Sequence, residues 1–211
     1  MKKHILPITI ILLTVIAWAI AFPKLPAELP THWGFNGEVN GYSTKLNAML
    51  TQIGIMILLY FSVAFLPKID PRRQNYKYFS GSYQTIYLSL LVLFFGLNIF
   101  VILFGLGYNI PMSSMGSVVI GIIFIVLGNV MQRVRSNFFI GIRTPWALSN
   151  EEVWRKTHRF GGRLFFGGGV LLVLSTFVSA AIRGYVIIGV IAVIVIAPYV
   201  YSYMVFKKLS K

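Results

Sequence analysis

Six long apolar segments constrain this chain more than any other feature of its sequence. Each holds roughly 17 to 23 residues, which is the length that a helix needs to cross the hydrocarbon core of a bilayer. A backbone in lipid must satisfy its own hydrogen bonds, and these segments lack the alternation of a porin strand. The sequence therefore predicts an all-α, polytopic membrane helix bundle of about six transmembrane helices, near residues 4–22, 48–66, 85–107, 115–132, 163–182 and 185–205.

The composition also indicates the membrane lipid bilayer as the surrounding medium. Hydrophobic residues make up 57% of the 211 positions and charged residues 11%, which is too apolar for a water-soluble globule of this size. The net charge of +14 would suit nucleic acid only if it formed one patch on a soluble domain, and the basic residues lie between apolar runs instead. We expect no direct nucleic-acid partner. The absence of cysteine excludes thiol catalysis and cysteine-based metal sites.

The distribution of basic residues predicts the topology. With both termini inside, all but three of the 19 Lys and Arg residues fall on the cytoplasmic side, the exceptions being Lys24, Lys45 and Arg183. The positive-inside rule then places both termini in the cytoplasm of a bacterial cell, with an extracytoplasmic loop over 23–47 and a cytoplasmic loop over 133–162. The N-terminal residues Lys2 and Lys3, with the small residues Ala19-Ile20-Ala21, also fit a cleaved secretory signal. The first apolar run is nearly of span length, which favours a retained helix.

The extracytoplasmic loop combines prolines, turn dipeptides and aromatic residues. Closely spaced prolines predict an extended departure from the first helix, and Asn36-Gly37 and Asn40-Gly41 predict a small hairpin or paired turns. One interpretation is an aromatic belt that docks the loop on the outer interface. The other is a surface that binds a hydrophobic or amphipathic ligand such as a peptide. The candidate binding residues here are His32, Trp33, Phe35 and Tyr42.

The cytoplasmic loop contains a compact string from Gly141 to Trp146 and then a helix start. Pro145 forces the residue before it to be extended, so the string specifies a particular shape. Ser149 and Glu152 have the spacing of a capping box, and pairs from Glu151 to Arg155 and from Glu152 to Lys156 support the first helical turns. The candidate binding residues here are Asn129, Gln132, Arg143, Thr144, Pro145, Trp146, Trp154, His158 and Arg159. The alternative interpretation is an interfacial anchor with arginines reaching lipid phosphates.

Polar residues within the spans predict packing rather than chemistry. Asn98 is expected to bond across helices, and the stripe Gly161, Gly168 and Ser175 to pack closely against a neighbouring helix. No span carries an ionisable residue away from its ends, which argues against a pump or antiporter. The histidines lie on opposite sides of the membrane, so we expect no metal site, no cofactor and no catalytic residue.

The two loops together resemble those of the SdpI family of bacterial multi-pass membrane immunity proteins. The first resemblance, to a short domain of unknown function at the N-terminus of these proteins, rests on Leu25-Pro26, Leu29-Pro30, His32-Trp33, Gly37 and Gly41. The more specific one rests on Gly128-Asn129, Met131-Gln132, Asn137, Gly141-Ile142-Arg143-Thr144-Pro145-Trp146, Trp154 and His158-Arg159-Phe160. The resemblance implies an N-terminal two-helix unit over 1–66 and a four-helix immunity domain over 67–211.

The resemblance also implies a function. The protein for which the family is named protects the cell from a secreted peptide toxin, and its toxin-bound form also holds a cytoplasmic transcriptional repressor at the membrane. The implied partners of this chain are therefore a peptide toxin outside and a repressor inside. The alternative function is transport of a small solute or peptide, which would need a polar route between the helices. An intramembrane enzyme is the third class, and only His158 with Glu151 or Glu152 resembles a catalytic set.

The topology is testable because the chain has no native cysteine. A single cysteine at Gly37 is expected to react with an impermeant maleimide in intact cells, whereas one at Asn150 is expected to react only after permeabilisation. The reverse labelling pattern would overturn the orientation.

Overall fold

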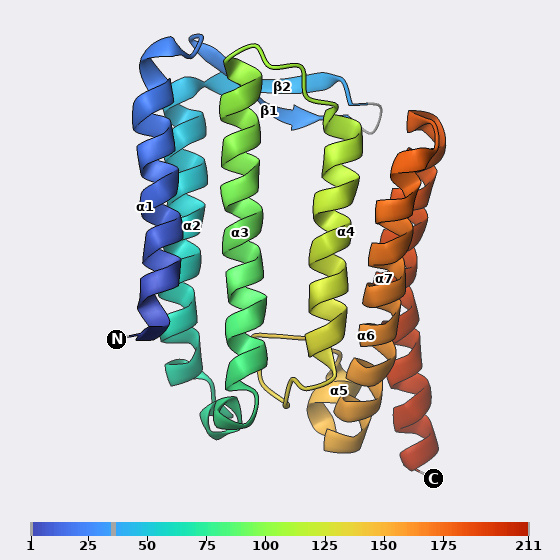
Figure 1. Cartoon of the computed structure of the whole chain (residues 1–211). Coiled ribbons are helices and arrows are strands. Elements are labelled where there is room, and N and C mark those ends of the chain that lie inside the picture. The colour runs from blue at the N-terminus through green and yellow to red at the C-terminus, as the bar shows by residue number, and fades with distance from the viewer. Residues whose placement is uncertain (1, 35–36, 211) are drawn as a thin grey trace. The chain divides into compact units, whose positions relative to one another are not determined.

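A computed structural model describes residues 2–34 and 37–210 of the chain. In this described part, six helices are long and apolar enough to cross a membrane. Figure 1 labels each of them. They are α1 (Lys2–Ala21), α2 (Lys45–Ile69), α3 (Ser80–Gly105), α4 (Met112–Met131), α6 (Glu151–Leu174) and α7 (Ala180–Leu209). The shorter elements are α5 (Pro145–Ser149), the turns η1 (Phe22–Lys24), η2 (Arg73–Tyr78) and η3 (Ser175–Phe177), and strands β1 (Glu28–Trp33) and β2 (Val39–Thr44). The predicted all-α polytopic bundle is confirmed.

The loop after α1 and η1 folds into a β-hairpin, as one of the two sequence interpretations predicted. Strands β1 and β2 are antiparallel, with Leu29 opposite Ser43 and Trp33 opposite Val39. The turn between them contains Gly37 at φ 86, a backbone conformation that favours glycine. Gly41 lies within β2 opposite His32 rather than in a second turn. The alternative of paired turns is therefore wrong.

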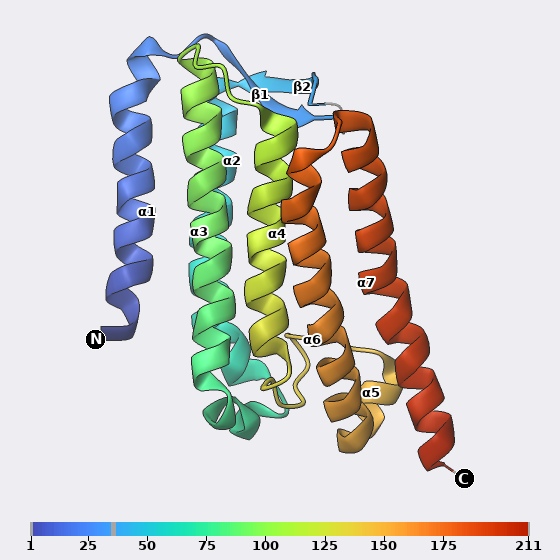
Figure 2. The ribbon, with the colours of Figure 1, turned by 45° about the vertical axis from the view of Figure 1, so that its right-hand side comes forward.

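Residue contacts divide the chain into two units. The first unit comprises Met1–Val63 and Tyr87–Gly116, and the second comprises Ala64–Ile86 and Ser117–Lys211. The first unit contains α1, the hairpin and most of α2 and α3. The second contains most of α4 and all of α5, α6 and α7, and Figure 2 shows α4, α6 and α7 running beside one another.

Buried polar contacts join the three helices of the first unit. The Trp18 indole of α1 donates from Nε1 to Oδ1 of Asn98 on α3 at 2.6 Å, and both side chains are fully buried. Asn98 donates from Nδ2 to the Phe94 carbonyl at 2.7 Å, and Thr14 on α1 lies 3.6 Å from the sulfur of Met56 on α2. The expectation that Asn98 bonds across helices is confirmed. Such a bond is favoured in lipid because no water competes for the amide.

Glycines bring α4 and α6 into backbone contact in the second unit. A Cβ added to Gly128 would lie 2.6 Å from the carbonyl oxygen of Gly162, and one added to Gly169 would lie 2.5 Å from that of Gly121. Gly128 thus faces Gly162, and Gly121 faces Gly169. The two glycines on each helix are seven residues apart. The predicted stripe of Gly161, Gly168 and Ser175 does not face α4 at Gly168. A Cβ added to Gly168 would lie 2.8 Å from Val190, so this glycine packs against α7.

The α6 helix ends at Leu174, so the predicted fifth span of 163–182 is wrong at its C-terminal end. Ser175 and Thr176 donate their hydroxyls to carbonyls three residues earlier, at 2.6 and 2.8 Å. The buried Arg183 of α7 donates to the Ser175 and Val178 carbonyls at 3.1 and 3.0 Å. Side chains thus satisfy the carbonyls that the helix end leaves without partners.

The glycine pairs predict a large difference between neighbouring positions on α6. Gly169→Ala is expected to destabilise the protein by about 1–3 kcal/mol, because the methyl group overlaps the α4 backbone. Gly167→Ala is the matched control, since a Cβ there meets nothing within 4 Å. Thermal unfolding in detergent checks this. Equal midpoints for the two variants would contradict the close packing of α4 on α6.

Candidate functional site

A buried carboxylate organises the loop after α4. Asp70, which directly follows α2, is only 2% exposed. Its Oδ2 accepts from the Phe138 amide and the Tyr76 hydroxyl, both at 2.9 Å, and its Oδ1 accepts from the Arg72 amide at 2.7 Å. Burial and the hydrogen bond to Asp70 raise the pKa of Tyr76 above its ordinary value, which keeps the phenol protonated as a donor. Asp70 is not among the candidate residues predicted from the sequence.

Asn137 and Arg72 complete this arrangement. The side-chain amide of Asn137 is fully buried, and both its oxygen and its nitrogen form hydrogen bonds. Oδ1 accepts from the backbone amides of Phe139 and Ile140 at 2.9 and 2.6 Å. Nδ2 donates to the carbonyls of Arg135 and Ile140, both at 2.9 Å. Arg72 donates to the Ser136 hydroxyl and to the Leu148 carbonyl. The loop therefore has a defined fold held by its own polar groups.

His158 of α6 fixes the position of the string that begins at Gly141. Its Nε2 accepts from the Ile142 amide at 3.0 Å, and its Nδ1 lies 2.9 Å from the Trp154 carbonyl oxygen. An amide can only donate and a carbonyl can only accept, so the imidazole is neutral with its proton on Nδ1. Gly141 has φ 109, and a Cβ there would collide with the imidazole. Only glycine fits this position on both grounds.

Trp154 packs beneath the same imidazole. Its ring is stacked on that of His158 with 4.0 Å between centroids, and its Nε1 donates to the Val134 carbonyl at 2.8 Å. Both side chains are almost completely buried. These two candidate binding residues therefore hold the loop against α6. His158 is fully buried, and Trp154 keeps a small exposed part that lines a cavity at the start of α6.

The rest of the string starts α5 and packs on α7. Thr144 is the N-cap of α5, accepting from the Ala147 amide at 3.0 Å, and Pro145 occupies the first helical position. Trp146 lies against Tyr199 and Tyr203 of α7, with 5.2 and 5.0 Å between ring centroids. The exposed Arg143 donates to the Phe138 carbonyl.

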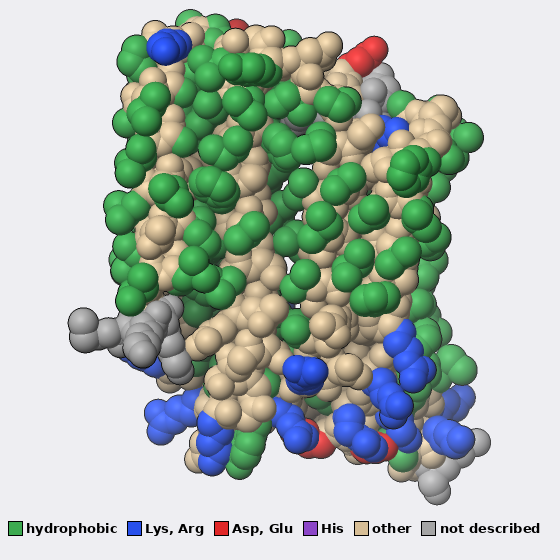
Figure 3. All heavy atoms as spheres, in the orientation of Figure 1, with side chains coloured by type: hydrophobic (Ala, Val, Ile, Leu, Met, Phe, Trp, Pro, Cys, Tyr) green, Lys and Arg blue, Asp and Glu red, His purple; other side chains and the backbone are tan. Residues whose placement is uncertain are grey.

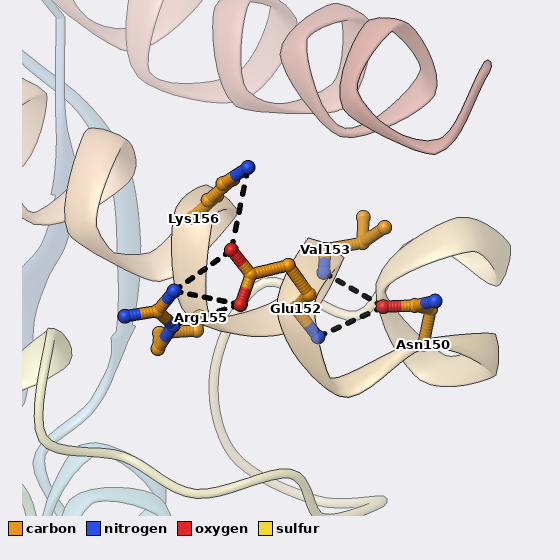
Figure 4. A network of polar contacts seen from close by, with 5 residues as sticks. All are labelled: Asn150, Glu152, Val153, Arg155 and Lys156. Carbon is orange, nitrogen blue, oxygen red and sulfur yellow. Dashed lines mark hydrogen bonds and ion pairs between the residues drawn. The ribbon is translucent and has the colours of Figure 1, made fainter. Parts of the chain in front are cut away.

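The start of α6 differs in detail from the predicted capping box. Figure 4 shows Asn150 as the N-cap, with Oδ1 accepting from the Glu152 and Val153 amides at 2.8 and 3.1 Å. Ser149 instead ends α5 and donates to the Trp146 carbonyl. Glu152 pairs with Lys156 as expected, at 3.3 Å, and also with Arg155 at 2.7 Å. The predicted serine cap is wrong because Asn150 stands one residue nearer to the helix and has the extended backbone that an N-cap needs.

The remaining candidates of this loop are exposed and lie together. Asn129, Gln132 and Arg159 line a cavity of about 260 Å³ between α4 and α6. Gln132 also lines an adjoining cavity of about 620 Å³, whose charged residues are Arg133, Arg135, Glu151, Glu152 and Arg155. We call the two cavities together the basic groove. Figure 3 shows Lys and Arg side chains gathered at the end of the second unit that carries α5 and the beginning of α6.

The hairpin separates its candidate residues. Trp33 is half-buried and packs edge-to-face on Phe104 of α3, with 6.2 Å between centroids and 77° between planes. Tyr42 is 62% exposed, and His32 is exposed and bonds to Asn40. Phe35 lies outside the described residues. Tyr42 and Trp33 therefore do not form one outward aromatic surface, because the Trp33 ring belongs to the packing of the first unit.

These features define a multi-pass α-helical membrane protein with a hairpin after its first helix and a folded polar loop before its fifth span. Residues 133–202 match the model of the SdpI/YfhL protein family, and residues 9–57 match the domain of unknown function DUF1648. The chain is 30% identical over 214 residues to the immunity protein SdpI of Bacillus subtilis strain 168, covering 100% of this chain and 99% of that relative. The chain therefore belongs to the SdpI/YfhL family. No solved structure matches it.

The role of His158 can be separated from that of Arg143. His158→Phe keeps a ring on Trp154 but leaves the Ile142 amide without its acceptor, so it is expected to cost about 1–3 kcal/mol of unfolding free energy. Arg143→Lys keeps a donor for the Phe138 carbonyl and is expected to behave nearly as wild type. Hydrogen exchange at Ile142 and thermal unfolding are the measurements. Slow exchange at Ile142 in His158→Phe would contradict the bond.

Proposed function

We propose that this protein is an immunity protein that protects its cell from a secreted membrane-active peptide toxin by binding the peptide at the membrane. The observation that carries the proposal is the full-length similarity to the immunity protein SdpI, which spans both loops and all six helices. The resemblance of the two loops to the family signatures supports it.

The geometry supports binding over chemistry. The family to which the chain belongs is not a family of enzymes. The candidate residue most suited to catalysis, His158, is enclosed and uses both ring nitrogens for the fold. Protection by binding requires only a recognition site, and we place that site at the hairpin.

We further propose that the hairpin is extracytoplasmic and the basic groove cytoplasmic. The positive-inside rule supports this orientation. Two of the three basic residues expected outside also serve main-chain carbonyls: Lys45 donates to Phe22 and Leu25 at 3.1 and 3.0 Å, and Arg183 caps η3. These two basic residues therefore have a structural role that accounts for their presence on the outer side. Cysteines at the exposed positions Tyr42 and Ser149 test the orientation with less disturbance than Gly37 or the N-cap Asn150.

A cytoplasmic transcriptional repressor is the second partner that we propose. The basic groove supports an acidic protein surface as its counterpart, because Arg133, Arg135 and Arg155 converge there with Glu151 and Glu152 as the only acids that line it in the described residues. Complementary charge chiefly raises the association rate and sets specificity. Loss of co-purification of such a repressor after Arg133→Glu, with protection retained, would separate signalling from immunity.

The central test is protection. Sensitive cells that express this protein are expected to survive the secreted toxin, and Trp33→Ala is expected to weaken peptide binding by about 2 kcal/mol, or roughly 30-fold, because buried aromatic anchors dominate binding energy. Tyr42→Ala is the control for a general hairpin effect, since Tyr42 is 62% exposed. Cell survival and surface-bound peptide are measured at equal protein abundance.

Transport is the outcome that would contradict this proposal. Protection that disappears when an ionophore collapses the proton gradient, together with release of peptide from the cells, would identify an exporter. Protection that persists with peptide retained at the surface supports binding.

A further inference from the structure

A cavity of about 370 Å³ lies within the first unit, between the hairpin and the two helices α2 and α3. The hairpin contributes Thr31, Trp33 and Ser43, and α2 contributes Thr51 and Gln52. Its volume is at the lower end of the range of about 300–1,000 Å³ that is usual for ligand sites. The cavity therefore has room for one large side chain and its adjoining backbone, and not for a long segment.

The lining of the cavity combines polar and apolar residues. The residues with hydroxyl groups are Thr31 and Ser43 of the hairpin and Thr51 of α2. The helices α2 and α3 supply an apolar wall from Ile55, Phe94, Leu97 and Val101. Thr51 is six residues beyond the start of α2, roughly 9 Å along the helix axis, so the cavity extends from the hairpin into the membrane-spanning part of the unit.

Two polar atoms of the cavity walls lack partners. Among residues 2–34 and 37–210, Nε1 of Trp33 is a buried donor with no acceptor, and Oε1 of Gln52 is a buried acceptor with no donor. A buried polar atom without a partner is costly, and such atoms are rare in native structures. In the described part of the second unit, Oγ1 of Thr157 is also a buried side-chain atom without a partner. Thr157 lines neither this cavity nor the basic groove.

We propose that this cavity is the peptide site: one apolar side chain of the bound peptide fills the apolar part, and a neighbouring peptide group accepts from Trp33 Nε1 and donates to Gln52 Oε1. The inference rests on the proposed function, since it names where and how the toxin is held. It explains why the Trp33 ring is packed on Phe104 rather than exposed, because the packing holds the indole at the cavity wall.

A peptide fits this pair of atoms better than a lipid does. A peptide group carries one donor and one acceptor, which are the two functions that the cavity lacks. A phospholipid acyl chain with its ester offers acceptors only and would leave Gln52 Oε1 without a partner. Water satisfies either atom but leaves the apolar wall unfilled.

The test uses a minimal probe that carries one ring and one peptide group, the methylamide of para-fluorophenylpropionic acid. The matching methyl ester keeps the carbonyl but has no N–H. Binding of each probe to the full chain in lipid nanodiscs is followed by fluorine NMR, with empty nanodiscs of the same lipid as the background. Wild type is expected to bind the amide about three- to tenfold more tightly than the ester, because one hydrogen bond is lost with the ester.

Three variants separate the two atoms. Gln52→Met keeps the length of the side chain without its oxygen and is expected to abolish the preference for the amide. Trp33→Phe keeps a ring without its N–H and is expected to weaken both probes about three- to tenfold while the preference persists. Tyr108→Phe removes the hydroxyl of an exposed residue of the first unit that does not line the cavity, and it is expected to change neither probe.

Equal affinity of amide and ester in wild type would overturn the proposal, and this result needs no variant to fold. Binding no stronger than to empty nanodiscs would also overturn it, as would displacement of both probes alike by added phospholipid. The test is separable from immunity. Amide-selective binding in a protein that gives no protection would contradict the proposed function alone, whereas full protection by Gln52→Met without amide preference would contradict only the placement of the site.

Discussion

The bilayer offers no hydrogen-bond partners, and this constraint governs where the polar residues of the chain lie. In the first unit the Asn98 amide takes the Trp18 indole, and at the hairpin end Lys45 serves two main-chain carbonyls. In the second unit Arg183 is buried against the carbonyls that follow α6, and both nitrogens of His158 are engaged. By contrast, Nε1 of Trp33 and Oε1 of Gln52 find no partner among the described residues, and both belong to the cavity that we propose for the peptide.

Much of the architecture follows from segment length and local pattern. Six apolar runs are sufficient to predict six spans, because a helix is the only open structure that satisfies its backbone in lipid. Asn98 in mid-span predicts an interhelical bond without naming its partner, which the fold supplies from 80 residues away. The end of α6 is less predictable, because apolar residues continue past Leu174 and it is the hydroxyls of Ser175 and Thr176 that turn the chain.

Contacts between distant segments are what the sequence does not reveal. Asp70 is a lone acid after a span, and its role depends on the Phe138 amide 68 residues later. The facing glycines of α4 and α6 did leave a signal, because Gly121 and Gly128 have the same spacing of seven as Gly162 and Gly169. The stripe at Gly161, Gly168 and Ser175 has that spacing as well, so spacing alone could not choose the face that meets α4.

The family signature in the polar loop mixes two kinds of residue. Thr144, Trp154 and His158 are buried and hold the loop, while Asn129 and Arg159 are exposed in the basic groove. A sequence motif cannot separate the two kinds, because both are fixed by the same fold. The result is a hydrogen-bonded loop that presents the basic groove at one end of the second unit, while the unpaired atoms of Trp33 and Gln52 lie in the first. The assignment of residues 1–66 and 67–211 to separate domains stays a prediction.

The central claim is that the toxin is held by the first unit. The most direct measurement replaces Thr51, in the cavity wall, with photoreactive benzoylphenylalanine and illuminates living, protected cells during exposure to the toxin. The same substitution at Ile188, which is 51% exposed on α7, serves as the control for random collision in the membrane. If the toxin is held by the first unit, a covalent toxin adduct is expected at position 51 and none at position 188. Protected cells with no adduct at position 51, or with equal adducts at both positions, would contradict it.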